Sequence, residues 1–251
     1  MPKSPNSHTL VAFDQELSHL DRLLVRQFEL VRGMIRDAMT AVAQCDVSLA
    51  RQIILRDNEV DDLEFAIENH CIKILALRSP IANDLRWVLA TLKASSELER
   101  MGDFSKNIGK RIDVLSLDPN IKVNQNLQMM GVVILDQLEK LLQAWIDEKA
   151  EPTMAVWKGD EAVDALYDST FRELLTQMTE FPLTINSNIH LLFIAKNMER
   201  LGDHITNIAE DLYYRITGQK PAADRPKADQ TCSAASYTDP ALMALKKEGA
   251  E

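Results

Sequence analysis

The chain has 251 residues, of which 46% are apolar and 26% charged, with only 8 glycines, 9 prolines and 6% aromatic residues. This composition favours long helices over a many-turned β fold, and the length allows one large domain or two of ordinary size. The formal net charge of −10 argues against nucleic-acid binding, which needs clustered Lys and Arg.

Apolar residues recur at helical spacing from Leu17 to Val42 and predict a first helix over about residues 8–43. A second helix is expected from an N-cap at Asp46 to about residue 77. A third should begin with Pro80 in its first turn and continue to about residue 115. The segment Ser-Leu-Asp-Pro-Asn at 116–120 predicts a break after these three helices.

Three further helices are expected after the break, at 124–149, 152–180 and 184–216, with Gly218 stopping the last one. Residues 219–251 are rich in Lys, Ala, Asp, Pro and Ser without sustained periodicity. We therefore predict an all-α fold with a three-helix unit at 1–117, a second at 118–218, and a disordered tail at 219–251 that holds at most one short helix near 241–247.

Two motifs occur once in each half. Glu-Arg-Met-Gly-Asp at 99–103 continues to Asn107 and matches Glu-Arg-Leu-Gly-Asp at 199–203, which continues to Asn207, with an offset of 100 residues and no gap. Upstream, Asp-x-x-Val-Asp-x-Leu occurs at 57–63 and again at 160–166. Two motifs repeated in the same order indicate an internal duplication.

The repeated motifs contain four pairs of carboxylates spaced four residues apart, which places each pair on one face of a helix. The pairs are Asp57 with Asp61, Glu99 with Asp103, Asp160 with Asp164, and Glu199 with Asp203. Like charges at this spacing destabilise a helix by about 0.2–0.5 kcal/mol per pair. Three interpretations remain open: a solvated acidic face, an ion-pair network with Arg100 and Arg200, or a metal site between neighbouring helices.

Two glycines within these helical stretches, Gly102 and Gly202, each cost about 1 kcal/mol relative to Ala. A glycine at the same place in both halves indicates that a neighbouring helix or a ligand comes close there. Ligation by carboxylates alone favours Mg²⁺, Ca²⁺, Mn²⁺ or oxidised iron, whereas zinc normally takes His or Cys ligands. His204 is a weaker candidate ligand, because the residue after Asp203 points away from it on a helix.

Motifs of other functional classes are missing from the sequence. A ferritin-like di-iron oxidase needs two Glu-x-x-His motifs, and only Glu16 to His19 fits; no phosphate-binding glycine loop or paired nucleophile is found either. We therefore expect no enzymatic activity, with a carboxylate-bridged metalloenzyme and a metal-free scaffold as alternatives. The three cysteines, Cys45, Cys71 and Cys232, form no disulfide framework, and no signal peptide or membrane span is evident, so the cytoplasm is expected.

The chain resembles the PhoU family of phosphate-uptake regulators. The resemblance covers roughly residues 8–217 and rests on His8-Thr9, on Phe13-Asp14-x-Glu16-Leu17, on the stretch 75–86, and on the motifs at 57–61, 99–107, 160–164 and 199–210. It implies two tandem three-helix bundles related by a pseudo-two-fold axis. It also implies metal binding, by Asp57, Asp61, Glu99 and Asp103 in one bundle and by Asp160, Asp164, Glu199 and Asp203 in the other, with Arg100, Arg200, Asn107 and Asn207 in support.

The resemblance further implies a regulator that restrains phosphate uptake and phosphate-starvation signalling. Such a protein would link the nucleotide-binding subunit of the phosphate ABC transporter to the phosphate-sensing histidine kinase. We expect a homodimer, located in the cytoplasm and held at membrane complexes through its partners. Family members hold iron or zinc clusters in some cases, and iron, zinc, manganese and magnesium are all candidates here.

Overall fold

The computed structural model describes residues 5–118, 121 and 123–221. Every regular element in this part of the chain is a helix, and it contains no strand. The predicted all-α fold is confirmed. The helices are α1 (Pro5–Gln44), α2 (Val47–Arg78), α3 (Ala82–Leu115), α4 (Gln125–Asp147), α5 (Ala150–Lys158), α6 (Asp160–Glu180) and α7 (Ile185–Thr217), with a short 3₁₀ turn at Pro182–Thr184. The predicted tail at 219–251 falls almost wholly outside the described residues, which end at residue 221.

Helix ends follow the local sequence at two of the predicted positions. Asp46 caps α2, and its side chain accepts a hydrogen bond from the Leu49 backbone N–H at 3.0 Å. Gly218 ends α7 in the left-handed region, at φ 72°, where its N–H donates to the Tyr214 carbonyl at 2.8 Å. Pro80 does not lie in the first turn of α3, which begins at Ala82. The prediction was wrong because Ser79 ends α2 at φ 47° and the chain then needs extended residues to reverse direction.

The helix predicted over 152–180 is instead divided at Gly159 into α5 and α6. The Gln137 side chain reaches across from α4 and donates to the Gly159 carbonyl at 2.6 Å, while the backbone bond from the Ala162 N–H to the same carbonyl is longer, at 3.4 Å. A Cβ at this position would lie 2.8 Å from Gln137 Nε2. The break therefore has a tertiary cause that helical periodicity does not show.

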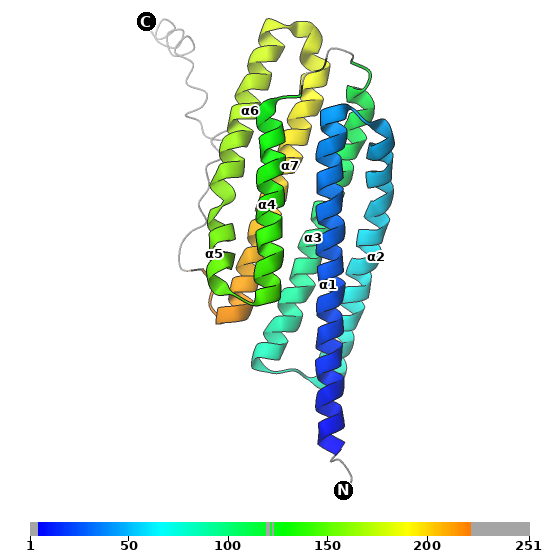
Figure 1. Cartoon of the computed structure of the whole chain (residues 1–251), viewed down its shortest axis with the longest axis vertical. Coiled ribbons are helices and arrows are strands. Elements are labelled where there is room, and N and C mark those ends of the chain that lie inside the picture. Colours follow the sequence, from blue (N-terminus) through cyan, green and yellow to red (C-terminus); the bar gives the residue numbers. More distant parts are fainter. Residues whose placement is uncertain (1–4, 119–120, 122, 222–251) are drawn as a thin grey trace, which may run out of the picture.

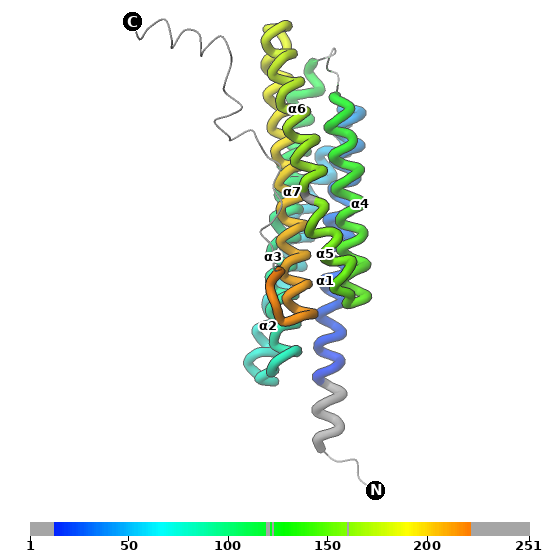
Figure 2. Tube along the Cα trace, turned by 90° about the vertical axis from the view of Figure 1, so that its left-hand side faces the viewer, coloured from blue at the N-terminus to red at the C-terminus, as the bar shows by residue number. Residues whose placement is uncertain are grey.

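The helices run up and down along the long axis of an elongated molecule, with α1–α3 in one half and α4–α7 in the other (Figure 1). Seen from the side, the molecule remains narrow (Figure 2). Each half is a three-helix bundle, because α5 and α6 together take the place that α2 holds in the first half. Among the described helices, none is long and apolar enough to cross a membrane.

The halves join along the antiparallel pair α3 and α7, whose contacts follow the 100-residue repeat. Lys93 pairs with Asp211 at 2.8 Å, and the equivalent positions 193 and 111 place the Arg111 guanidinium 4.3 Å from the Phe193 ring centroid. At the centre, Phe104 contacts its own repeat partner His204, with ring centroids 5.1 Å apart. These reciprocal contacts mark the pseudo-two-fold axis.

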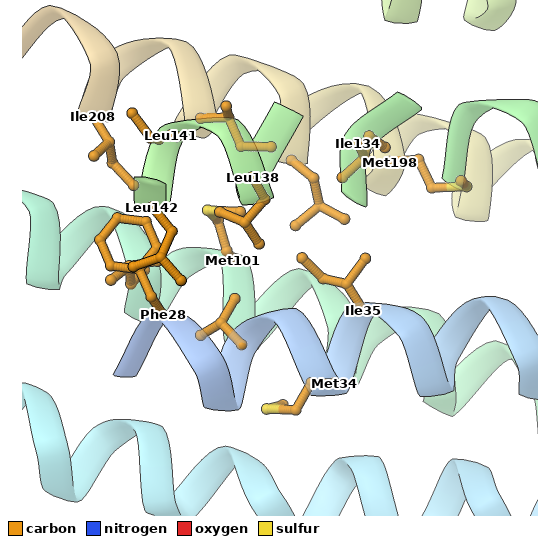
Figure 3. Packing of buried hydrophobic residues seen from close by; sticks show 14 of the residues in the cluster. Phe28, Met34, Ile35, Met101, Ile134, Leu138, Leu141, Leu142, Met198 and Ile208 are labelled. Carbon is orange, nitrogen blue, oxygen red and sulfur yellow. The ribbon is translucent and has the colours of Figure 1, made fainter. Parts of the chain in front are cut away.

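One continuous apolar core extends through both halves. In Figure 3, residues of α1, α3, α4 and α7 meet between the halves, among them Phe28, Met101, Leu138 and Ile208, all fully buried. Gly131 of α4 lies where a Cβ would be 2.6 Å from Met39 Cγ, so α4 and α1 approach closely. Burial of such side chains contributes about 1.5–3 kcal/mol each, and the shared core holds the halves in register.

Candidate metal centres

The first acidic site lies between α2 and α3. Asp57 is 1% exposed, while Asp61 lies one turn further along α2 at the surface. Glu99 and Asp103 face them from α3, half-buried. A Cβ at Gly102 would be 3.3 Å from Val60 Cγ1 and 3.5 Å from Asp57 Oδ1, so the glycine permits the close approach of α2 and α3 beside the carboxylates.

Mutual repulsion confirms that these side chains form one cluster. Burial raises the pKa of Glu99 to about 7, and the charges of Asp103, Glu64 and Asp61 add to the shift. Burial also raises the pKa of Asp61, with further contributions from Asp57 and Asp103. A cation placed among these carboxylates would relieve the repulsion.

The cation present in the first site is Lys106 of α3. Its Nζ forms ion pairs with Asp57 of α2 and, at 3.3 Å, with Asp103 Oδ1 on its own helix. These contacts raise the pKa of Lys106, chiefly through the hydrogen bond to Asp57. Lys106 therefore offsets part of the charge of this site.

The second acidic site lies between α6 and α7. Asp164 is 4% exposed and Glu199 6% exposed, and Asp203 lies one turn beyond Glu199 on α7. Burial raises the pKa of Glu199, and the charges of Asp203 and Asp164 contribute to the rise. Asp160 is the first residue of α6, and its side chain falls outside the described residues.

A lysine also faces the second site, but from a different position. Lys196 pairs with Glu199 Oε1 at 2.8 Å from the preceding turn of α7, and its Nζ lies 4.9 Å from the centroid of the Tyr167 ring. The other oxygen of Glu199, Oε2, is buried and has no hydrogen-bond partner among the residues that the structure describes. An acceptor left this way suits a bound cation.

The arginines and asparagines of the two motifs differ in exposure and in the groups that they contact. Arg100 and Arg200 are exposed, and the Arg200 guanidinium lies 5.7 Å from the centroid of the Phe104 ring. Asn207 donates to Glu97 Oε2 at 3.0 Å across the α3–α7 pair, while Asn107 is half-buried on α3. Lys106 and Lys196 thus form ion pairs with the motif carboxylates, and the charge of Arg100 also opposes the rise in the pKa of Glu99, so the ion-pair interpretation stays open with lysines added to it.

A resident metal ion fits the chemistry of these sites but not yet their side-chain positions. Carboxylate oxygens from two helices are a donor set for hard cations such as Mg²⁺ or Mn²⁺. Within the described part of the chain, however, no three His, Cys, Asp or Glu side chains are placed to hold one ion. Binding would require the lysine to leave and the carboxylates to rotate inward.

Sequence reasoning missed Lys106, Lys196 and Glu97, which is the partner of both His204 and Asn207. Both lysines lie three residues from a motif carboxylate, on the same helical face, and that spacing was a readable signal. His204 Nδ1 instead contacts Glu97 Oε2 at 2.5 Å, between residues 107 positions apart. Such a contact between distant residues has no local signature.

The duplicated helices, the central α3–α7 pair and one carboxylate cluster in each half define the class: a tandem-repeat helical bundle with two acidic sites. The PhoU domain model matches this chain twice, over residues 24–112 and 127–212. This chain belongs to the PhoU family.

Relatives extend the match over nearly their full length. The chain is 40% identical over 223 residues to a phosphate-specific transport system accessory protein PhoU homolog of Caulobacter vibrioides strain NA1000 / CB15N, covering 88% of this chain and 97% of that protein. The homolog of Rhizobium meliloti strain 1021 is 40% identical over 235 residues, 93% and 99% of the two chains.

Solved structures match the fold closely. The phosphate transport system regulatory protein PhoU of Streptococcus pneumoniae has a TM-score of 0.79 at 32% identity, over 84% of this chain and all of that one. PhoU of Pseudomonas aeruginosa has a TM-score of 0.80 at 30% identity, over 82% of this chain and all of that one.

Proposed function

We propose that this protein is a non-catalytic negative regulator of phosphate uptake and of phosphate-starvation signalling. The observation that carries the proposal is the match, over almost their whole length, to relatives named as accessory proteins of a phosphate-specific transport system. The protein would act as an adaptor, with the transporter's nucleotide-binding subunit and the phosphate-sensing histidine kinase as partners. A homodimer in the cytoplasm, held at the membrane by these partners, is part of the same proposal.

A deletion strain tests the regulatory role. Without the protein, phosphate uptake and phosphate-starvation genes should stay active in phosphate-rich medium, and the intact gene supplied in trans should restore repression. Normal uptake together with normal gene expression in the deletion strain would contradict the proposal.

We further propose that each acidic site binds metal, with a structural or sensing role. The support is the paired carboxylates, the buried Glu199 oxygen without a partner among the described residues, and the burial and repulsion that together raise the pKa of Glu99. Elemental analysis of protein purified without chelator is the direct measurement. If no metal were bound, and Mn²⁺, Fe²⁺ or Zn²⁺ gave no thermal stabilisation, the sites would be acidic clusters that only lysine neutralises.

Two substitutions separate the sites. Asp103→Ala and Asp203→Ala should each remove the metal of one half and leave the other half loaded, because the sites lie in different bundles. Asp113→Ala is the matched control, since Asp113 is an exposed carboxylate further along α3 and lies outside both motifs. Loss of all metal from either single variant would mean one shared site.

A further inference from the structure

Arg215, in the last turn of α7, lies buried where the two halves meet. Its side chain is only 6% exposed, and its guanidinium carbon lies 4.4 Å from the ring centroid of Trp87 and 4.9 Å from that of Trp145. Trp87 belongs to α3 of the first half and Trp145 to α4 of the second. The arginine therefore sits between an aromatic ring of each half, a favourable arrangement for a cation.

The hydrogen bonds of Arg215 are incomplete. Nη2 donates to Glu148 Oε1 at 2.8 Å, but Nη1 is buried and has no hydrogen-bond partner within the described residues. A buried donor of a charged group left without an acceptor is unfavourable, because the group has lost its hydrogen bonds to water. An acceptor from outside the described chain would remove that cost.

Two cavities border Arg215 and supply space for such an acceptor. The larger, of about 380 Å³, is lined by Asp21, Arg22, Val25, Trp145, Ile146, Glu148 and Arg215. The smaller, of about 140 Å³, is lined by Asn83, Trp87, Glu148, Arg215 and Ile216. At roughly 30 Å³ per water molecule, the larger cavity has room for a small solute together with ordered water.

The walls of the larger cavity offer both donors and acceptors. Arg22 and Arg215 supply cationic N–H groups, whereas Asp21 and Glu148 supply carboxylate oxygens. Asp21 already accepts from Trp87 Nε1 at 2.9 Å. Trp145 Nε1 is buried and has no hydrogen-bond partner among the described residues. Burial raises the pKa of Asp21, and the nearby Trp145 indole opposes that rise.

The opposite end of the molecule shows that the fold itself does not require this cluster. The 100-residue repeat places Leu115 where the second half has Arg215, and Ser187 where the first half has Trp87. Leu115 is fully buried, so the equivalent position is closed by an ordinary apolar side chain. The equivalent backbone position is thus filled without an arginine, so the charged cluster is particular to this end of the molecule and is not a requirement of the fold.

We propose that the larger of these two pockets binds a phosphate group that still carries a proton, as inorganic phosphate does at neutral pH. The phosphate oxygens would accept from Arg215 and Arg22, and its O–H would donate to the carboxylate of Asp21 or Glu148. A fully ionised anion such as sulfate has no O–H, and the two carboxylates would repel it.

Occupancy of the larger pocket would connect the two halves, since Asp21 and Arg22 come from the first half and Trp145 and Arg215 from the second. A ligand that contacts both halves stabilises the arrangement in which they are docked. The pocket would then report phosphate to the partners of the protein, a role that rests on the proposed regulatory function. Binding itself does not depend on that role.

Calorimetric titration of the full-length protein tests the site, with inorganic phosphate, glycerol 3-phosphate and sulfate as separate probes. Phosphate should bind, and sulfate should bind at least about tenfold more weakly. Binding of glycerol 3-phosphate but not of inorganic phosphate would identify a monoester as the ligand and overturn the assignment to free phosphate. Equal binding of sulfate, or no phosphate binding up to about 10 mM, would overturn the proposal.

Variants locate the site. Arg215→Leu copies the opposite end of the molecule and should therefore fold, while weakening phosphate binding at least about tenfold. Asp21→Asn should let sulfate bind. Arg111→Leu is the control, because Arg111 also lies over an aromatic ring, that of Phe193, but borders neither cavity.

Two results would overturn the assignment of phosphate to this pocket. If Arg215→Leu is folded by circular dichroism and binds phosphate like the parent, the site is wrong. If it does not fold, Arg22→Leu, which removes the other proposed donor at an exposed position of α1, replaces it, and unchanged phosphate affinity in that variant overturns the proposal. In either case the deletion-strain phenotype is unaffected, so failure of the pocket is distinguishable from failure of the regulatory function.

Discussion

The two acidic sites place the same carboxylates on equivalent helices but recruit their lysines from opposite directions. In the first half Lys106 follows Asp103 by three residues and reaches across to Asp57 on α2. In the second half Lys196 precedes Glu199 by three residues on α7. The positions equivalent to these lysines are Thr206 and Ser96. Both sites therefore have a lysine close to their carboxylates, but the two lysines occupy different positions in the repeat.

The sites also differ in which carboxylate is buried and paired. In the first, the lysine neutralises Asp57, which is 1% exposed, and leaves the half-buried Glu99 under repulsion from its neighbours. In the second, the lysine neutralises Glu199, which is 6% exposed. The first lysine thus pairs with a carboxylate of each helix, whereas the second pairs with Glu199 on its own helix and contacts the Tyr167 ring of α6.

Removing the two lysines should have the largest effect on stability among the variants that compare the two sites. Lys106→Ala leaves the buried Asp57 without the cation that faces it across the helices, and we expect a loss of about 2–3 kcal/mol in the free energy of unfolding of metal-free protein at pH 7, discounted for the partial exposure of Lys106. Lys196→Ala should also lower the free energy of unfolding, because it removes the cation that pairs with the buried Glu199. Urea unfolding in the presence of chelator measures both.

Lys110→Ala is the control for these variants, since Lys110 is exposed one turn further along α3. A Lys106→Ala effect no larger than that of the control would show that Asp57 does not depend on the lysine.

The same lysines should compete with metal. If each occupies the place of a cation, Lys106→Ala and Lys196→Ala should each bind Mn²⁺ about tenfold more tightly than the parent, because a positive charge beside the carboxylates has been removed. Titration followed by Mn²⁺ paramagnetic resonance measures the change. Weaker binding in either variant would mean that the lysine helps to orient the ligands instead of blocking them.

The raised pKa of Glu99 predicts a pH-dependent difference between the sites. A folded-state pKa of about 7, against an ordinary value of 4.5, means that the folded chain binds more protons than the unfolded chain between these values. The free energy of unfolding contributed by this group therefore falls as pH rises from about 4.5 to 7. Glu99→Gln should remove that fall, so its stability relative to the parent should be higher at pH 8 than at pH 5.

The expected gain for Glu99→Gln is under about 1 kcal/mol, because water screens this partly exposed group. Glu199→Gln should change stability in the same direction, since the pKa of Glu199 is also raised, first by burial. Urea unfolding at pH 5 and pH 8 measures both variants, and a pH profile unchanged by Glu99→Gln would contradict the prediction.

The smallest effect is expected from the arginines of the repeated motif. Arg100→Gln and Arg200→Gln should each change the free energy of unfolding by no more than about 0.5 kcal/mol, because both side chains are exposed. Arg200 is expected at the upper end of this range, since it lies over the Phe104 ring. Thermal denaturation of both variants measures the change in stability. A loss of stability as large as that of Lys106→Ala would show that the arginines are the main partners of the carboxylates.

Much of the fold was readable from residues near one another in the chain. Helical periodicity predicted the helices, Asp46 and Gly218 marked two of their ends, and the repeated Glu-Arg-x-Gly-Asp motif predicted the duplication. The pairing of carboxylates on one helical face follows from the 3.6-residue period alone. These features depend on local backbone geometry, which neighbouring residues determine.

Other features depend on residues that only the tertiary structure brings together. The break at Gly159 requires Gln137 of another helix, the contact of Asn207 with Glu97 joins residues 110 positions apart, and Arg215 meets Trp87 and Trp145 only because the two halves pack against each other. The sequence by itself determined which carboxylates this protein has and on which helical faces they lie. The pairing of Lys106 with Asp57 on another helix, and the incomplete hydrogen bonding of Arg215, were decided by packing, because side-chain partners across helices leave no periodic signal in the chain.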